Sequence, residues 1–265
     1  MPRSFSVTAK STFSRAAVAA LLLASSAGAS ATAADNPLID ASVAHEGRSE
    51  TDKARDAGRR PGDVLRFFGV EEGDHVIEIG AGGGYYSELL SRSVGDGGYV
   101  FAFNPYFFLK FVSEEIAERY GDGELDNVVL SFGSLFKQQL SPAQFDAAYF
   151  VDIYHDIFYS EKTGDAISPQ GSATLRETYR ILKPGGVVGI VDHKAAAGST
   201  RAAAAGLHRI PVTTLRSDFE AAGFVFVSAS DMLANSEDPG TKPWFGDPAL
   251  KDATDRMVLK FKKPE

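Results

Sequence analysis

The sequence predicts an α/β protein built on a doubly wound, Rossmann-like and mostly parallel sheet of seven strands. Short runs of β-branched and aromatic residues alternate with segments of helical periodicity, as in parallel strands joined by helices. A glycine-rich loop at residues 80–84 follows the first of these runs. No helical pattern separates the last two runs, so we expect an antiparallel terminal strand inserted beside the fifth strand.

Turn and capping residues predict the elements of the first half. Thr51 or Asp52 could cap a short helix in the charged segment 50–60. Pro61 suits the first turn of the next helix, which Gly69 ends. The elements that follow are expected in the order strand 76–79, a helix from residue 85, strand 99–103, helix 105–120 and strand 128–132.

The same signals predict the second half. Strand 147–151 leads to helix 171–182, which the Lys-Pro-Gly-Gly turn at 183–186 should stop before strand 187–191. The alanine- and glycine-rich stretch 195–206 is predicted to be a mobile loop. A helix at 212–222 should end at a glycine, and the last two strands are expected at 224–227 and 257–261.

The chain divides into three predicted parts. Residues 1–33 have the form of a secretory signal peptide, with basic residues before the apolar run 16–24 and an Ala-x-Ala pattern at 31–33. We therefore expect an exported protein, in the periplasm or outside the cell. An uncleaved anchor is the alternative, although the apolar run is too short for a stable membrane span. Residues 34–60 form a polar lead-in, and residues 61–265 form the α/β domain.

Charge and cysteine content exclude several classes of protein. The chain has 27 Lys and Arg against 35 Asp and Glu, a net charge of −8. Residues 1–33 hold three of the basic residues and no acidic residue, so the remainder has a net charge of −11. Nucleic acid is therefore not an expected partner. Because the chain has no cysteine, disulfides and thiolate metal sites are excluded.

The glycine loop predicts a cofactor site. Gly80, Gly82 and Gly84 can take positive φ and let a ligand lie against bare backbone. A dinucleotide loop needs glycine at its sixth position, but the sixth residue here is Tyr85, so NAD is disfavoured. Glu78 followed by alternating glycines resembles motif I of the class I S-adenosylmethionine (SAM)-dependent methyltransferases. A tight turn that binds no ligand is the alternative.

Polar residues follow the fourth and fifth strands, where a parallel sheet presents its ligand-binding edge. Asp152, His155 and Asp156 come directly after the fourth strand, and His193 ends the fifth. His155 could take a proton from an attacking hydroxyl or amine, and either aspartate could orient it. The alternative is that His155 and Asp156 cap the next helix. His208 joins the other two histidines on this edge, but no tight ligand pair occurs, so we predict no metal. A zinc, iron or manganese site on these imidazoles and carboxylates, serving hydrolysis, is the alternative.

Several segments together resemble the exported, predicted class I methyltransferases of bacteria, and the resemblance covers about residues 48–263. The motifs that carry it are Arg55-Asp56 with Arg59 and Pro61, Gly82-Gly83-Gly84-Tyr85-Tyr86, Asp152 with Tyr154-His155-Asp156, Leu182-Lys183-Pro184-Gly185-Gly186, Asp192-His193, His208-Arg209-Ile210, Ala222-Gly223-Phe224 and Asp255-Arg256. The resemblance implies the fold, SAM as the cofactor, and lead-in arginines that cap the cofactor pocket. A solvated charged helix is the alternative for these arginines.

The resemblance also implies the roles of the site residues. The expected catalytic residues are His155, Asp156 and His193, and the expected cofactor-binding residues are Glu78, Gly80, Ala81, Gly82, Gly84, Asn104, Ser134 and Asp152. Asn104 and Ser134 replace the acids that commonly meet the ribose and the adenine, so a neutral amide would supply a weaker bond to the ribose hydroxyls. The expected partner is a small-molecule methyl acceptor. A metabolite-binding module without catalysis is the alternative.

Overall fold

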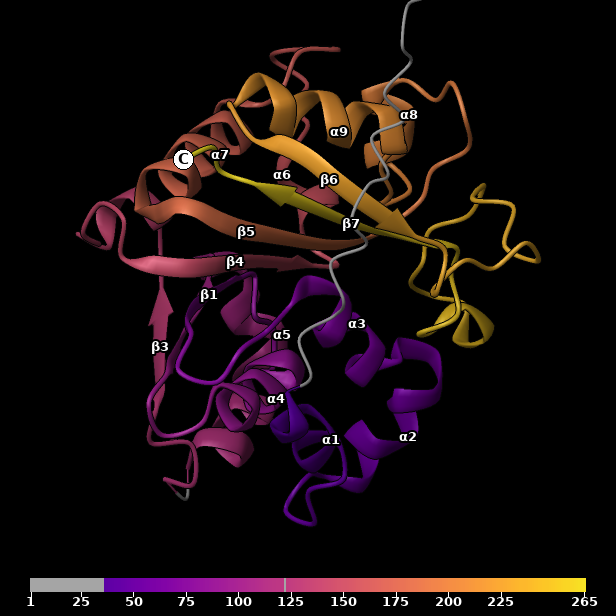
Figure 1. Ribbon diagram of the computed structural model, residues 1–265. Helices are drawn as coiled ribbons and strands as arrows, with labels where there is room; N and C mark the ends of the chain where they lie inside the picture. The colour runs from indigo at the N-terminus through magenta and orange to yellow at the C-terminus, as the bar shows by residue number, and fades with distance from the viewer. Residues whose placement is uncertain (1–35, 122) are drawn as a thin grey trace, which may run out of the picture. The chain divides into compact units, whose positions relative to one another are not determined.

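Residues 36–121 and 123–265 are described by the computed structural model (Figure 1). A seven-stranded sheet with the order β3-β2-β1-β4-β5-β7-β6 forms their centre. The strands are β1 (His75–Ile79), β2 (Tyr99–Asn104), β3 (Val128–Phe132), β4 (Phe145–Val151), β5 (Leu182–His193), β6 (Val225–Ser230) and β7 (Arg256–Lys262). The first five are parallel, and β7 runs antiparallel between β5 and β6. The predicted fold class and the reversed strand beside the fifth are therefore confirmed.

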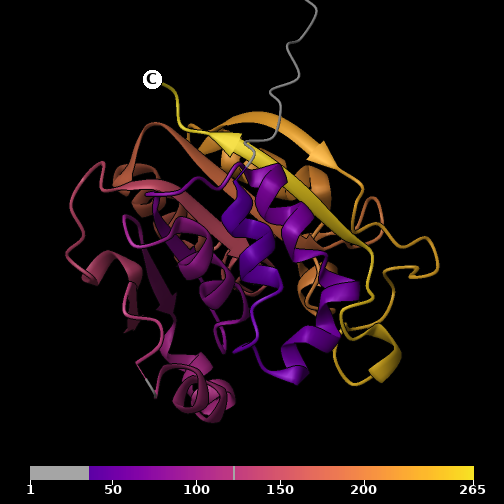
Figure 2. The same ribbon diagram turned by 60° about the horizontal axis from the view of Figure 1, so that its bottom comes forward.

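Helices cover both faces of the sheet (Figure 2). The α-helices are α1 (Pro37–Val43), α2 (Glu50–Arg59), α3 (Pro61–Phe68), α4 (Tyr85–Val94), α5 (Leu109–Tyr120), α6 (Tyr154–Ile157), α7 (Pro169–Ile181), α8 (Arg201–Ala205) and α9 (Val212–Ala221). Single 3₁₀ turns lie at η1 (Tyr106–Phe108), η2 (Leu135–Lys137) and η3 (Pro248–Leu250). The apolar cluster on one face includes residues of α1, α3 and α4, and the cluster on the other includes residues of α6, α7 and α9.

Aromatic side chains fill the core on both faces. Phe68 of α3 stacks on Tyr149 of β4 with ring centroids 5.2 Å apart. This stacking depends on Gly189 of β5, because a Cβ there would lie 2.5 Å from the Phe68 ring. On the opposite face, Phe219 of α9 stacks on Phe261 of β7 at 5.2 Å. The core therefore fixes the central strands of the sheet, β4, β5 and β7, against the helices on both faces.

Several element boundaries differ from those expected. Ser49 caps α2 by accepting a bond from the Asp52 amide, so neither Thr51 nor Asp52 is the cap. Helix α7 ends at Ile181, as the turn at 183–186 predicted, but the strand begins earlier than expected: β5 starts at Leu182, and its register with β4 shifts before Val187. Residues 183–186 therefore form an irregular stretch of β5 between two residues, Leu182 and Val187, that pair with β4. The stretch 195–206 contains α8, whose first turn is capped by Thr200.

The lead-in is folded onto the domain from residue 36 onward. Asn36 caps α1, and its side-chain amide donates to the carbonyls of Val70 and Ser93. Helix α1, which the sequence did not predict, packs against α4. The predicted helix 105–120 is divided by an extended Pro105 and the turn η1, so α5 itself begins at Leu109.

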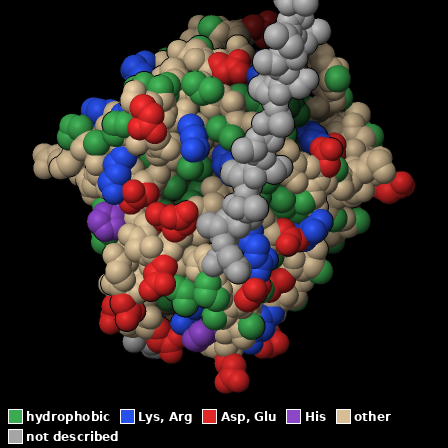
Figure 3. All heavy atoms as spheres, viewed as in Figure 1, with side chains coloured by type: hydrophobic (Ala, Val, Ile, Leu, Met, Phe, Trp, Pro, Cys, Tyr) green, Lys and Arg blue, Asp and Glu red, His purple; other side chains and the backbone are tan. Residues whose placement is uncertain are grey.

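Of the other expectations, those on residues 1–33 lie outside the described residues. Among residues 36–121 and 123–265, no helix has both the length and the apolar character needed to cross a bilayer. The face drawn in Figure 3 carries interspersed acidic and basic side chains. The expectation about nucleic acid stays a prediction.

Candidate functional site

The carboxyl ends of β1, β2, β4 and β5 lie side by side, because these four strands are parallel neighbours in the sheet. The glycine loop follows β1, Asn104 ends β2, Asp152 follows β4 and His193 ends β5. The structure therefore brings most of the predicted site residues to one edge. Ser134 lies farther out, ahead of η2, where its carbonyl accepts a bond from Gln138.

The glycine loop is held by hydrogen bonds to the end of β2. The amides of Gly80 and Ala81 both donate to the Phe103 carbonyl, at 2.8 and 3.1 Å. The Gly82 amide donates to Asn104 Oδ1 at 2.8 Å, and Asn104 Nδ2 donates back to the Gly82 carbonyl at 3.0 Å. Loops that bind pyrophosphate leave such amides free for the anion. This loop therefore suits a ligand without phosphate.

Asn104 thus holds a different position from the one expected. Its side chain is fully buried, and both its oxygen and its nitrogen are bonded to Gly82. We expected this amide to accept a ribose hydroxyl. In the structure Asn104 instead fixes the loop backbone. This role depends on a contact between β2 and the loop after β1, which the spacing of residues in the sequence does not predict.

The loop glycines have unequal surroundings. A Cβ at Gly80 would overlap the Ile153 side chain, so this glycine permits close packing after β4. A Cβ at Gly82, where φ is +58°, would meet no atom of the described residues within 4 Å. At Gly83 and Gly84 a Cβ would overlap side chains of α5. Gly82 is therefore the loop position that faces open space.

Helix α5 is fastened to the loop by Arg119. Its Nε donates to the Gly83 carbonyl at 2.7 Å, and its Nη2 donates to Asp52 at 2.5 Å. Arg119 also pairs with Glu88 of α4. Asp52 and Glu88 are buried carboxylates that would be costly without countercharges, and Arg119 lies between them while Arg55 also pairs with Asp52 and Arg92 with Glu88. Sequence reasoning missed Arg119, because nothing in its spacing connects α5 to the loop.

Glu78 lies beneath the loop in a fully buried position. Ser87 of α4 donates to its carboxylate at 2.5 Å. Burial raises the pKa of Glu78 to about 7, although the Ser87 bond and the positive charges of Arg59 and Arg119 act in the opposite direction. Glu78 is therefore partly protonated near neutral pH in the protein without ligand.

Because the pKa of Glu78 is raised in the folded protein, we predict that its contribution to the free energy of unfolding falls as pH rises from 4.5 to about 7. Between pH 4.5, the ordinary value, and about pH 7, the folded protein keeps a proton that the unfolded chain has released. This shift of about 2.5 pH units is worth on the order of 3 kcal/mol of unfolding free energy, lost as pH rises through that window. Urea unfolding from pH 4.5 to 8 should therefore show Glu78→Gln gaining stability relative to the wild type as pH rises. Glu161→Gln, an exposed substitution, should run parallel to the wild type. Parallel curves for Glu78→Gln would contradict the prediction.

The lead-in arginines gather around Tyr85, the first residue of α4. The guanidinium groups of Arg48, Arg55 and Arg59 lie 5.5, 5.2 and 4.7 Å from the ring centroid. Arg59 also donates to Asp252 at 2.6 Å and approaches Asp152 at 3.4 Å. These arginines are therefore built into the site edge and are not a solvated face.

Asp152 is strained and incompletely bonded. Its φ is +53°, a conformation that costs free energy for a residue with a side chain. Oδ2 lies 3.4 Å from Arg59, whereas Oδ1 is buried and has no hydrogen-bond partner among the described residues. Burial alone would raise the pKa of Asp152, but the nearby positive charges of Arg59 and Arg256 help to hold it below the ordinary value. An enclosed carboxylate oxygen is thus left without a hydrogen bond from the described residues, with His193 Nε2 at 3.7 Å.

His155 is completely buried against Asp192. His155 Nδ1 lies 2.6 Å from Asp192 Oδ1, and the His155 backbone amide donates to Asp192 Oδ2 at 3.0 Å. Burial lowers the pKa of His155, but the Asp192 charge and bond outweigh it and raise the pKa to about 9. Without a ligand, His155 is therefore a cation at neutral pH and a poorer base than expected. It lies in α6, within a helix and not at its cap.

His193, in contrast to His155, is uncharged at neutral pH. Its Nδ1 lies 2.6 Å from Thr254 Oγ1, and Trp244 stacks on its ring at 5.3 Å. Burial lowers its pKa to about 3, despite the nearby Asp152 charge. Trp244 and Thr254 belong to the long connection between β6 and β7, which sequence reasoning left without a role.

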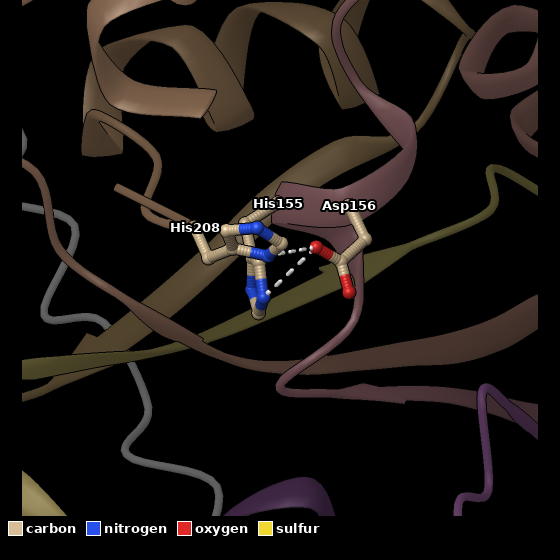
Figure 4. A group of neighbouring side chains, drawn as sticks. All are labelled: His155, Asp156 and His208. Atoms are coloured by element: carbon tan, nitrogen blue, oxygen red, sulfur yellow. Dashed lines mark hydrogen bonds and ion pairs between the residues drawn. The ribbon is translucent and has the colours of Figure 1, made fainter. Parts of the chain in front are cut away.

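His208 completes a group with His155 and Asp156 (Figure 4). His208 Nδ1 lies 2.6 Å from Asp156 Oδ1, and His155 Nε2 lies 3.4 Å from the same oxygen. One ligand atom from each of the three residues lies within 4.8 Å of the others, a spacing compatible with a metal ion. The sequence placed all three on this edge, but the pairing of His208 with Asp156 depends on the loop after α8.

Comparison with known proteins supports the fold and leaves the activity open. No family model matches the chain. The demethylmenaquinone methyltransferase of Listeria welshimeri is 24% identical over 130 residues, which are 49% of this chain and 49% of that protein. The chain thus matches only about half the length of this curated relative.

Solved structures share the fold at low identity. A SAM-dependent methyltransferase from Aquifex aeolicus superimposes with a TM-score of 0.53 at 20% identity, covering 79% of this chain and 95% of that one. The [4+2]-cyclase SpnF superimposes with a TM-score of 0.51 at 15% identity, covering 80% and 81%. The fold of the chain is therefore that of class I methyltransferases, a fold that also supports another reaction.

Proposed function

We propose that the protein binds SAM beside the glycine loop and transfers its methyl group to a small-molecule acceptor. The observation that carries the proposal is Asp152 Oδ1, a buried carboxylate oxygen that lies 3.7 Å from His193 Nε2 but has no hydrogen-bond partner among the described residues. Such an oxygen is costly unless a ligand satisfies it. SAM carries an ammonium and a sulfonium group, and either one complements this charge.

The loop supports the same cofactor. Gly82 faces open space, and the neighbouring amides already have partners, so the loop can line a ligand without binding phosphate. Glu78 adds negative charge beneath the loop when it is ionised. In this proposal Gly80 and Asn104 shape the loop, Ala81 and Gly82 line the cofactor, and Asp152 binds its cationic part.

Helix α5 limits the direction of approach. Its side chains occupy the space beside Gly83 and Gly84, so the cofactor must reach the loop from the Gly82 side. Gly84 then serves the packing of α5 and contributes less to the ligand than expected. Ser134 and the exposed Tyr106, beyond the ends of β3 and β2, remain available for the adenine end.

The acceptor belongs beside the histidines in this proposal. His155, Asp156 and His193 follow β4 and β5, next to Asp152. Methyl transfer needs mainly an aligned acceptor and the exclusion of water, because the cofactor carries the reactive carbon. Aromatic Trp244, stacked on His193, suits a flat or partly apolar acceptor.

Calorimetry tests the proposal on protein that begins at Ala34. We expect SAM and S-adenosylhomocysteine each to bind once per chain. Asp152→Asn should weaken SAM binding about 10- to 100-fold, because an amide replaces a charge-assisted bond. Asp126→Asn, at an exposed position, is the matched control and should bind as the wild type does. Binding of neither ligand, or unchanged binding by Asp152→Asn, would overturn the proposal.

A binding module without methyl transfer is the second candidate. The fold shared with the [4+2]-cyclase does not specify methylation, so ligand binding and methyl transfer need separate tests. Ligand binding without turnover of a labelled methyl group, across a panel of phenol, amine and quinol acceptors, would favour the module.

We also propose that the protein is exported and that its signal segment is removed. The support is the basic, apolar and Ala-x-Ala pattern of residues 1–33. Mass spectrometry of the protein recovered from fractionated cells should find an N-terminus near Ala34 in the exported fraction.

A further inference from the structure

We propose that His155, Asp156 and His208 bind a divalent transition-metal ion of the zinc type. The three side chains converge from α6 and from the loop after α8 (Figure 4). Two imidazoles and one carboxylate form a donor set that suits zinc and related ions and is unattractive to calcium or magnesium. This inference replaces the sequence-based expectation of no metal and does not depend on SAM binding.

The ligand atoms have nearly the required separation. Zinc bonds of about 2.0–2.1 Å in tetrahedral geometry place ligand atoms about 3.3 Å apart. His155 Nε2 and Asp156 Oδ1 are 3.4 Å apart. His208 Nδ1 and Asp156 Oδ1 are 2.6 Å apart, a hydrogen bond that must open by somewhat less than 1 Å. His208 can make this movement, because its side chain is 42% exposed and lies in a loop.

The lack of a hydrogen bond from His155 Nε2 to any described residue supports the site independently of these distances. The His155 side chain is completely buried, yet Nε2 has no hydrogen-bond partner among the described residues. A buried ring nitrogen that lies 3.4 Å from a carboxylate without bonding to it is costly. A metal ion between Nε2 and the carboxylate would satisfy both groups.

The opposite side of the His155 ring is arranged as in metal sites. His155 Nδ1 bonds to Asp192 Oδ1, which also accepts from the His193 amide at 2.7 Å, and Asp192 Oδ2 accepts from the His155 amide. Metal-bound histidines usually donate their second ring nitrogen to a carboxylate, which fixes the ring and the free nitrogen. Asp192 therefore orients Nε2, and a metal ion that binds there would displace the Nε2 proton to solvent.

Three protein ligands leave room for another group. Catalytic zinc sites commonly hold three side chains and keep one position for water or a substrate oxygen. Here the partly exposed Asp156 and His208 lie on the outer side of buried His155. A bound ion would thus be reachable by a hydroxyl or carboxylate of a small molecule, and would polarise that oxygen.

Metal titration of the tag-free, EDTA-dialysed chain tests the site. We expect one Zn²⁺ per chain by calorimetry, and one Co²⁺ with visible absorption bands that Zn²⁺ displaces. His208→Ala and Asp156→Asn should each weaken Zn²⁺ binding more than about 100-fold, since each removes a ligand. Asp192→Asn should weaken it about 10- to 100-fold, because it removes only the support of His155.

A distant histidine provides the matched control. His75 lies at the amino end of β1, away from the site edge, and His75→Ala should bind Zn²⁺ as the wild type does. Circular dichroism checks that each variant is folded. If His208→Ala does not fold, Asp156→Asn alone tests the loss of a ligand. Absence of stoichiometric Zn²⁺ binding by the wild type, or equal loss in His75→Ala, would overturn the proposal.

Discussion

Gly82→Val should weaken SAM and S-adenosylhomocysteine binding by about 100-fold or more, a loss of about 2.7 kcal/mol. Gly82 is the loop residue whose missing side chain faces open space, so the new isopropyl group would fill the volume proposed for the cofactor. The backbone there has a φ of +58°, and valine in that conformation adds strain of roughly 1–3 kcal/mol. Calorimetry measures the affinity, and urea unfolding measures the strain separately.

Gly73→Val is the matched control. Gly73 has a φ of +87°, and a Cβ there would meet no described atom within 4 Å. It lies ahead of β1, at the end of the strand opposite the loop. Both variants should lose similar stability, but only Gly82→Val should lose binding. Equal affinities in the two variants would show that the cofactor does not contact Gly82.

The fold could be predicted because its signals are local. Alternating strands and helices predicted the parallel sheet, and the missing helix before residue 257 predicted the reversed strand. The boundaries that failed depend on distant contacts. The chain at 183–186 belongs to β5 because Leu182 and Val187, on either side of it, pair with β4, and Gly185 and Gly186 exchange backbone bonds with Lys263. Helix α1 exists because Asn36 bonds to the Val70 and Ser93 carbonyls and α1 packs on α4.

The candidate site was predictable in position but not in roles. The carboxyl edge of a parallel sheet placed the glycine loop, Asp152 and His155 together from the order of the strands alone. The role of Asn104 required knowing that its amide bonds across to Gly82. Likewise, the attachment of Arg119 to the loop depends on the path of α5, which a helical pattern does not specify.

The long connection between β6 and β7 was the largest omission. It carries no periodic pattern, yet it supplies Trp244 against His193 and Asp252 against Arg59. A buried ion pair holds this connection in place. Arg209 and Asp238 are both fully enclosed, with Arg209 Nη1 and Nη2 at 2.8 and 3.1 Å from the carboxylate oxygens.

We predict that Arg209→Ala will destabilise the protein by about 3–5 kcal/mol. The substitution leaves the buried Asp238 carboxylate without its countercharge and removes the donors to the carbonyls of Lys194 and Lys242. Arg216→Ala breaks an exposed pair with Glu220 and removes a cation–π contact with Phe226 at 4.1 Å, and should cost at most about 1.5 kcal/mol. Urea unfolding followed by circular dichroism measures both losses.

The fluorescence of Trp244, the single tryptophan of the chain, separates two ways in which this loss can arise. If the connection and the sheet unfold together, the fluorescence and circular dichroism transitions of Arg209→Ala coincide at a lower urea concentration. If the ion pair fixes mainly the connection, the fluorescence of Arg209→Ala changes before the sheet unfolds, because Trp244 leaves the His193 ring first. Because His208 and Arg209 are adjacent, the second outcome would also loosen His208 and couple the proposed metal site to the ion pair. A loss no larger than that of Arg216→Ala would contradict the prediction.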